Sequence, residues 1–253
     1  MIARALTCLL LLCASSMAQA QQTQQQGAEE DPTRAVFLSL REEHRNLMSG
    51  AWNYRMVLRK DVVLLQGRRF APRGFLTRAD FPVASTHAGS ETHTGLGDLY
   101  SQVLFVPYSN REHAFAVGTG LIFPTATHKT LGAGKWQIAP MVAPVWYLAP
   151  TKGFFFVKLQ DVISFAGVGN RPDIHYLLLT PTLLYRPVKR WWVVADLESR
   201  TNWKNDNRTD FRAGFQVGRV VGGKLGFALK PEIPFGGTRL GDWSFQFSLI
   251  RYQ

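Results

Sequence analysis

From residue 34 onward, apolar residues recur at every second position of the chain. In Lys224–Ile233 the odd-numbered residues are apolar, whereas the even-numbered ones are small or charged. The segments 243–249 and 114–123 show the same alternation. Successive side chains of a β-strand point to opposite faces, so these segments are predicted strands with one apolar face. Small and charged residues on the second face are typical of the interior of a membrane barrel.

The same pattern predicts strands along the whole chain. They are expected at 52–65, 74–84, 97–107, 113–123, 136–148, 153–165, 174–186, 191–199, 211–220, 224–233 and 243–252. Most have about ten residues or slightly more, the length of a tilted transmembrane strand. Short connections are expected at 108–112, 149–152, 187–190 and 221–223, and long ones at 85–96, 124–135, 166–173, 200–210 and 234–242. Short periplasmic turns that alternate with long outer loops are typical of bacterial outer-membrane barrels.

The number of strands gives a further expectation. Eleven segments are an odd number. If the N-terminus lies on the periplasmic side, one more strand that runs from the periplasm to the exterior is required before residue 52. Residues 35–44 can supply it, because they alternate as well. A short helix is the alternative, since Leu40, His44 and Leu47 also fit helical spacing. We therefore expect an all-β, antiparallel transmembrane β-barrel of about twelve strands, an even number as in bacterial barrels.

Aromatic residues cluster near the ends of the predicted strands. Girdles of Trp and Tyr at the two membrane interfaces explain this placement. A soluble β-sandwich, whose core also contains aromatic residues, is the alternative fold. The residues are Trp52, Tyr54, Tyr108, Trp136, Trp146, Tyr147, Tyr185, Trp191, Trp192, Trp243 and Tyr252.

The first twenty residues have the features of a secretory signal peptide. Arg4 precedes a short apolar stretch, and Ala18-Gln19-Ala20 is an A-x-A site that predicts cleavage after Ala20. Both cysteines, Cys8 and Cys13, lie in this segment, so the mature chain would contain no disulfide, thiolate zinc site or cysteine nucleophile. We expect three parts: the signal peptide 1–20, a Gln-rich tether or plug-like tail at 21–33, and the outer-membrane barrel at 34–253.

Composition narrows the class of protein further. The chain is 46% apolar and 19% charged, which excludes a disordered polar chain. No apolar run reaches the roughly 18 residues that a membrane helix needs. The formal charge is +11, and loss of Arg4 with the signal peptide leaves +10. Because export argues against a nucleic-acid partner, the expected partners are outer-membrane lipid, lipopolysaccharide phosphates, the barrel-assembly machinery and a small-molecule solute.

Motifs for catalysis or cofactor binding fail on their spacing. Gly132–Lys135 resembles part of a phosphate-binding loop, but Lys129 stands at the first glycine position and Trp136 replaces the required Ser or Thr. His87 and His93 lie in one expected loop without the spacing of metal ligands. No His-x-Ser pair occurs, although distant Ser–His partners stay open for an outer-membrane lipid-modifying enzyme. We expect a protein that is not an enzyme, with no catalytic residues, no cofactor and no metal.

Charged and amide side chains occupy the polar face of many predicted strands. A charge on the lipid face costs about 2–4 kcal/mol at the bilayer midplane, so these side chains are expected to line the lumen. They either favour passage of anions or polarisable solutes, or form a lattice of salt bridges that fills a narrow barrel. Asp161 is the exception, since it is in phase with the apolar residues of its strand. The lumen-lining candidates are Arg55, Arg59, Arg78, Asp80, Asp98, Gln102, Lys158, Gln160, Asp196, Glu198, Arg212, Gln216, Lys224, Lys230 and Glu232.

The middle third of the chain carries a sharper motif. Gly95-Leu96-Gly97-Asp98-Leu99 is followed by the stretch 118–127, GTGLIFPTAT, and then by 131–136, LGAGKW. This sequence motif resembles that of the bacterial outer-membrane proteins of the phenol-degradation meta-pathway (MetA-pathway) transporter-like family. The resemblance implies an outer-membrane channel for hydrophobic or aromatic compounds and brings no catalytic residues. The motif residues with an expected structural role are Gly118, Gly120, Pro124, Thr125, Gly132, Gly134, Lys135 and Trp136.

Barrel construction alone also explains this motif. Gly118 and Gly120 face inward and leave room for close packing, which we expect to be loop 124–135 folding back. Pro124 would end the strand at the outer rim, and Trp136 would re-enter at the interface.

Taken with the positive charge, these observations predict an outer-membrane, porin-like channel for small hydrophobic or aromatic compounds, with a weaker indication of anionic ones. The alternative is a closed structural barrel with a plugged interior, whose basic loops at the outer rim bind lipopolysaccharide.

Overall fold

The computed structural model describes residues 38–47, 50–69, 71, 74–148, 152–236 and 241–252. The expected signal peptide at 1–20 and the Gln-rich segment at 21–33 lie outside the described residues. Within the described ranges, no helix has both the length and the apolar character needed to cross a membrane.

The described residues form thirteen antiparallel strands in a single sheet. The strands are β1 (Leu38–Asn46), β2 (Trp52–Leu64), β3 (Phe75–Ala88), β4 (Glu91–Leu96), β5 (Leu99–Ser109), β6 (His113–Phe123), β7 (Lys135–Leu148), β8 (Gly153–Gly167), β9 (His175–Tyr185), β10 (Trp191–Asn202), β11 (Arg208–Val221), β12 (Leu225–Phe235) and β13 (Trp243–Arg251).

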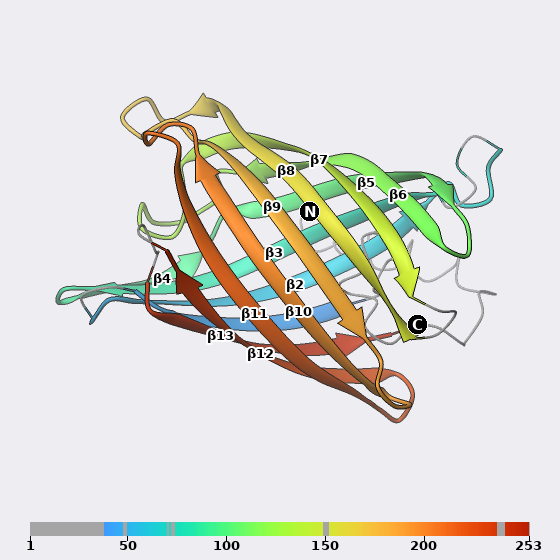
Figure 1. Ribbon diagram of the computed structural model, residues 1–253. Helices are drawn as coiled ribbons and strands as arrows, with labels where there is room; N and C mark the ends of the chain where they lie inside the picture. The colour runs from blue at the N-terminus through green and yellow to red at the C-terminus, as the bar shows by residue number, and fades with distance from the viewer. Residues whose placement is uncertain are drawn as a thin grey trace, which may run out of the picture.

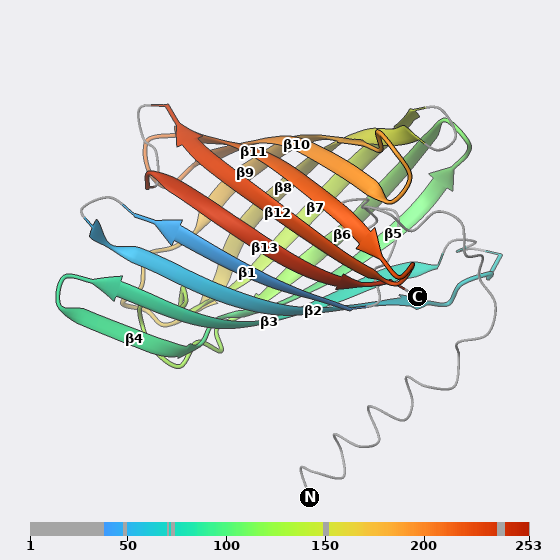
Figure 2. The same ribbon diagram turned by 90° about the horizontal axis from the view of Figure 1, so that it is seen from below.

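The sheet closes on itself into a barrel (Figures 1 and 2). Neighbours in sequence pair with one another from β5 to β13, then β13 pairs with β1, β1 with β2, and β2 with β3. β4 and β5 share one place in the ring, because β4 pairs with the second half of β3 and β5 with the first half. The wall therefore has twelve strand positions, and the predicted twelve-stranded antiparallel barrel is confirmed.

β1 is the strand that makes closure possible. Leu40 pairs with Leu58 on one side and with Leu249 on the other, so β1 bridges the first and last parts of the barrel. The prediction of a strand at 35–44 is thus confirmed for its described part, and the helical alternative is wrong. The alternation of Ser39, Arg41 and Glu43 against Leu38 and Leu40 decided this, not the helical spacing.

Two of the expected long loops are wrong. β3 continues to Ala88 and forms a tight hairpin with β4 inside the expected loop 85–96, with His87 opposite Thr92. β10 and β11 likewise extend into the expected loop 200–210 and leave a five-residue connection at 203–207. These extensions are polar on both faces: the hydroxyls of Thr201 and Thr209, for example, lie 2.9 Å apart. Backbone pairing continues beyond the apolar belt, where alternation of apolar residues is no longer required.

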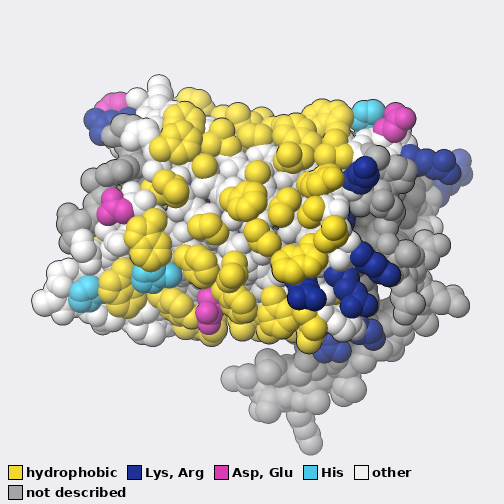
Figure 3. All heavy atoms as spheres, turned by 60° about the horizontal axis from the view of Figure 1, so that its bottom comes forward, with side chains coloured by type: hydrophobic (Ala, Val, Ile, Leu, Met, Phe, Trp, Pro, Cys, Tyr) yellow, Lys and Arg dark blue, Asp and Glu magenta, His cyan; other side chains and the backbone are white. Residues whose placement is uncertain are grey.

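The barrel is apolar outside and polar inside. Outward side chains such as Phe115, Phe227 and Ile233 are exposed, and apolar atoms cover much of the wall in Figure 3. Inward side chains such as Gln216 and Glu232 are each 3% exposed. This arrangement is the reverse of a soluble β-sandwich, and it is the one a bilayer stabilises.

The two ends of the barrel differ. At the terminus end, β1 begins and β13 ends, beside the connections 65–74, 110–112, 149–152, 186–190 and 222–224. At the loop end lie the connections 47–51, 89–90, 124–134, 168–174, 203–207 and 236–242.

The interior near the terminus end is an apolar layer. Trp192, Leu184 and Ile250 have no exposed surface, and Phe154 is 2% exposed. Trp192 and Tyr252 were expected in the interfacial girdle, as was the partly buried Tyr147 that packs beside them, but all three point inward. They share a parity with the lumen residues of their strands, which outweighs their position at a strand end. The layer comprises Val63, Leu76, Leu104, Val106, Ala114, Ala116, Met141, Ala143, Val145, Phe154, Phe156, Leu184, Trp192, Val194, Val220, Ala228, Ile250 and Tyr252.

A glycine makes room for the largest ring of this layer. The indole of Trp192 lies over Gly218 on the neighbouring strand, where an added Cβ would collide with three atoms of the ring. Gly226, one strand further, is similarly close to the rings of Trp192 and Tyr252. The absence of side chains at these glycines allows one large ring to extend across three strands.

We expect Gly218→Val to destabilise the barrel, because the added methyl groups overpack the apolar layer by about 1–3 kcal/mol. The measurement is the midpoint temperature of heat modifiability on a gel. Gly169→Val is the matched control, since nothing lies within 4 Å of its added Cβ. Equal midpoints for the two variants would contradict the packing described here.

Candidate functional site

Above the apolar layer, the interior is lined by ion pairs between neighbouring strands. On the wall formed by β2 and β3, Arg59 lies directly opposite Asp80, with Nε–Oδ1 at 2.9 Å. Two residues further, Arg78 lies opposite Asp61, with Nε–Oδ1 at 3.2 Å. Because each charge has a partner on the adjacent strand, these pairs offset the cost of removing the charges from bulk water.

The facing wall carries a denser network on β10, β11 and β12. Arg212 contacts Glu198 at 2.7 Å and Glu232 at 3.3 Å. Lys230 contacts Asp196 at 2.8 Å and also Glu232 at 3.1 Å. The hydroxyl of Ser244 donates a further hydrogen bond to Glu232 at 2.7 Å. Glu232 thus receives three donors, which explains how a carboxylate that is 3% exposed stays charged inside the barrel.

Three arginines stand apart from these pairs. Within the described part of the chain, no ion pair involves Arg41, Arg55 or Arg200. The buried Nε atoms of Arg41 and Arg200 have no hydrogen-bond partner. The guanidinium of Arg200 instead stacks on the ring of Tyr176, 4.1 Å from its centre. A guanidinium whose buried Nε has no hydrogen-bond partner is a group that an anionic ligand would stabilise.

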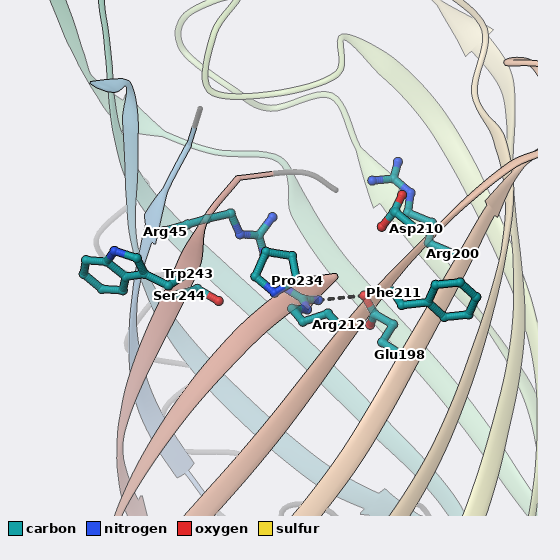
Figure 4. A pocket seen from close by; sticks show the side chains of 9 residues that line it. All are labelled: Arg45, Glu198, Arg200, Asp210, Phe211, Arg212, Pro234, Trp243 and Ser244. Carbon is teal, nitrogen blue, oxygen red and sulfur yellow. Dashed lines mark hydrogen bonds and ion pairs between the residues drawn. The ribbon is translucent and has the colours of Figure 1, made fainter. Parts of the chain in front are cut away.

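A small cavity adjoins Arg200. It has a volume of about 60 Å³ and lies between β10, β11, β12, β13 and the end of β1 (Figure 4). Arg200 and Asp210 lie opposite each other on adjacent strands at its edge, and the Arg212–Glu198 pair forms its floor. A cavity of this size and polarity is large enough for a few water molecules. The lining residues are Arg45, Glu198, Arg200, Asp210, Phe211, Arg212, Pro234, Trp243 and Ser244.

An uncharged network crosses a third part of the wall. Tyr100 donates from its hydroxyl to Gln102 at 2.8 Å and accepts from the amide of Gln160 at 3.4 Å. The tyrosine ring lies over Gly120, where a Cβ would come 2.5 Å from it. Gly118 lies similarly against Leu104. The expectation that loop 124–135 packs on these two glycines is therefore wrong, because backbone and side-chain atoms of β5 occupy the space beside them.

Most of the expected lumen residues share this interior. Arg55, Arg59, Arg78, Asp80, Gln102, Lys158, Gln160, Asp196, Glu198, Arg212, Gln216, Lys230 and Glu232 lie at inward-facing register positions. Lys224 does not, because it lies exposed in the turn before β12. Asp161 faces outward, as its phase indicated, and pairs with His175 at 3.2 Å near the loop end.

Asp98 has a different role from the one expected. It lies in the break between β4 and β5, and its carboxylate accepts the backbone N–H groups of Ala126 at 3.1 Å and Ala133 at 2.6 Å. It therefore anchors loop 124–134. Thr125 and Thr127 add hydrogen bonds from the same loop to the backbone of Gly97, Leu96 and Leu99.

The glycines of the motif explain why this loop is so compact. A Cβ at Gly132 would collide with Ala126 and the Asp98 carboxylate, and one at Gly95 would collide with Thr127. Gly134 has a φ of 66°, which favours glycine. The two parts of the sequence motif, 95–99 and 118–136, are thus one structural unit in space.

Sequence reasoning missed several interior charges. Arg41, Glu43 and Arg45 lie on β1, whose inward phase was visible only if the helical alternative was set aside. Asp61 lies two residues from Arg59 on the same face of β2, and this spacing could have revealed it as an interior residue that pairs with Arg78. Arg200 and Asp210 fell inside an expected loop. No group of three or more His, Asp or Glu side chains that could hold a metal ion occurs among the described residues.

Basic residues gather at the terminus end. Among the described residues, the terminus-end connections contain a single acidic residue, Glu112, whereas the loop-end connections contain three acidic and three basic residues. Figure 3 shows the Lys and Arg side chains concentrated at one end of the barrel. The basic residues of the terminus-end connections are Arg68, Arg69, Arg111, Lys152, Arg186, Lys189, Arg190 and Lys224; the loop-end connections contain Lys129, Arg171 and Lys204 with Asp173, Asp206 and Asp242.

The fold is similar to that of several solved outer-membrane β-barrels. An outer-membrane channel from Pseudomonas putida F1 is similar, with a TM-score of 0.69, 12% identity, and coverage of 90% of this chain and 98% of that one. The NanC porin has a TM-score of 0.62, 11% identity, and coverage of 85% and 100%. The KdgM porin has a TM-score of 0.56, 11% identity, and coverage of 85% and 98%. No family model and no curated protein matches the chain, so the similarity concerns the fold.

We expect Asp98→Ala to release loop 124–134, because two backbone N–H groups lose their acceptor at a cost of about 1–3 kcal/mol. Trypsin should then cleave after Lys129 in the folded barrel, as detected by mass spectrometry of the intact chain. Glu112→Ala, which removes an exposed carboxylate at the other end, should leave that cleavage as slow as in the unchanged chain. Equal resistance of both variants would argue against the anchor.

Proposed function

We propose that this protein is an outer-membrane channel for small hydrophobic or aromatic compounds that carry a negative charge. In this proposal the loop end faces the cell exterior and the terminus end faces the periplasm, as the longer loops and the position of the strand termini favour. The observation that carries the anionic part is the pair of buried, unpartnered Nε atoms on Arg41 and Arg200.

The two layers of the interior support an amphipathic solute. A carboxylate would receive hydrogen bonds from arginines of the outer half, where Arg200 also presents a stacked aromatic neighbour, Tyr176. The apolar body of the solute would then contact the apolar layer, with Trp192 and Phe154 in its path. An aromatic carboxylate would make both kinds of contact, whereas an inorganic ion lacks the apolar body and a neutral sugar lacks the charge.

The structural neighbours are consistent with this chemistry. One solved structure of the KdgM porin is a complex with oligogalacturonate, an anionic ligand, at a TM-score of 0.56 and 9% identity. The basic connections at the terminus end would favour departure of an anion toward that side.

A closed structural barrel is the second candidate function. The observation in its favour is the complete burial of Trp192, Leu184 and Ile250 in the apolar layer. If that layer does not open, the barrel conducts nothing and its function lies at its surfaces.

Single-channel recording in planar bilayers separates the two functions. We expect the unchanged chain to conduct with anion selectivity, and Trp192→Ala to increase the conductance because it removes the largest side chain of the apolar layer. The double variant Arg41→Gln, Arg200→Gln should lower the anion-to-cation permeability ratio about fivefold, since two lumen charges are lost. Absence of conductance in both the unchanged chain and Trp192→Ala would favour the closed barrel and end the channel proposal.

Benzoate and benzamide test the substrate class. In the same recordings, benzoate should interrupt the current at lower concentration than the uncharged amide of equal shape, and Arg41→Gln, Arg200→Gln should remove the difference. Lys204→Gln, in the 203–207 connection, is the control and should keep it. Equal block by both compounds in the unchanged chain would contradict a role for the arginines in selection.

A further inference from the structure

A larger cavity lies at the loop end, outside the charged interior described above. It has a volume of about 770 Å³ and is formed where loop 124–134 meets the connection 168–174. Pockets of a few hundred to about a thousand Å³ are typical of small-molecule sites. We call it the rim pocket; its chemically distinctive lining residues are Asp98, His128, Lys129, Trp136 and Arg171.

Both walls of the rim pocket are held in place. Asp98 anchors the loop on one side through two backbone N–H groups. On the other side Val168 donates its N–H to the carbonyl of Gly134 at 3.0 Å. The guanidinium of Arg171 donates to the carbonyl of Lys129 and so joins the two walls directly. The pocket therefore belongs to the fixed part of the rim.

The charge available to a ligand in the rim pocket is positive. Asp98 is the acidic residue of its lining, and the carboxylate is already used by two N–H donors. The nearby Asp173 is paired with Lys135 at 3.0 Å. The hydrogen bond from Lys135 lowers the pKa of the Asp173 carboxyl, so the two opposite charges of this pair offset each other. Lys129 and Arg171 are left as the two cations that face a bound molecule.

Aromatic surfaces complete the pocket. Trp136 is 39% exposed, and its indole makes a T-shaped contact with the ring of Phe123, with ring centres 5.2 Å apart. His128 stacks on His93, with ring centres 3.6 Å apart. Partial desolvation and the neighbouring His93 and Lys129 lower the pKa of His128, which favours the neutral form of its ring, a flat surface in the pocket wall.

We propose that the rim pocket is a binding site for aromatic carboxylates, which Arg171 and Lys129 hold by the carboxylate and Trp136 by the ring. A guanidinium binds a carboxylate through charge-assisted hydrogen bonds, and an exposed indole stacks on a planar ring. The pocket would capture such compounds at the mouth of the barrel before they reach Arg200. This loading role rests on the channel function proposed above, whereas the binding itself does not.

The test is direct binding to the full chain in nanodiscs of phosphatidylcholine, a lipid without net charge. The probes are 4-(trifluoromethyl)benzoate and 4-(trifluoromethyl)benzamide, observed by ¹⁹F NMR. We expect the carboxylate to bind more tightly than the amide. The double variant Lys129→Gln, Arg171→Gln should weaken carboxylate binding about tenfold, the loss expected for two charge-assisted contacts. Trp136→Leu should weaken binding of both probes.

Two controls separate the rim pocket from the lumen. Arg208→Gln removes a loop-end cation outside the pocket and should leave carboxylate binding unchanged. Arg41→Gln, Arg200→Gln should also leave rim binding intact, even if it abolishes selective conductance. Thus a channel that does not conduct but binds the carboxylate through Arg171 would retain this inference and lose only the proposed function.

Two results would overturn the inference. One is equal affinity for the carboxylate and the amide, and the other is an unchanged carboxylate affinity in Lys129→Gln, Arg171→Gln. If that double variant keeps the probe but loses lipopolysaccharide added to the nanodiscs, the two cations serve a lipid phosphate, and the rim pocket is not a carboxylate site.

Discussion

The requirement that every backbone N–H and C=O of the wall find a partner governs this structure. A sheet that a bilayer surrounds can meet it only by closing, because an open edge would leave a row of unpaired groups in hydrocarbon. Closure depends on β1, a nine-residue strand that pairs along its whole length with β2 on one side and β13 on the other. Once the ring is complete, each residue faces either the exterior or the lumen, and the two-residue alternation of the sequence follows.

Side chains fill the interior of the closed ring in two ways. Near the loop end, acidic and basic residues on adjacent strands form ion pairs at matching register, as Arg59 and Asp80 do. Near the terminus end, large aromatic rings pack over glycines, as Trp192 does over Gly218. The boundary between these two arrangements divides the lumen into a charged half near the loop end and an apolar half near the terminus end.

The sequence predicted the parts of the fold that the bilayer dictates. Strand phase, strand number and the inward set of charges follow from alternation, and Lys230 and Glu232 were found in this way. Sequence-based prediction failed outside the bilayer, where strands need no apolar face. The β3–β4 hairpin is polar on both faces, so only its backbone pairing reveals it. Trp192 and Asp98 were misplaced for a related reason. Residue type suggested an interface and a lumen, whereas the actual role of each depends on neighbours distant in sequence, Gly218 and the amides of Ala126 and Ala133.

The contact between Trp192 and Gly218 also restricts how this barrel can change over generations. A smaller residue at 192 causes no collision, although it leaves a cavity in the apolar layer. A larger residue at 218 is accepted only after the ring at 192 has become smaller, since the added Cβ would collide with the indole. The two substitutions therefore have a required order. Replacing Trp192 first avoids the collision, whereas replacing Gly218 first passes through a barrel that overpacking destabilises.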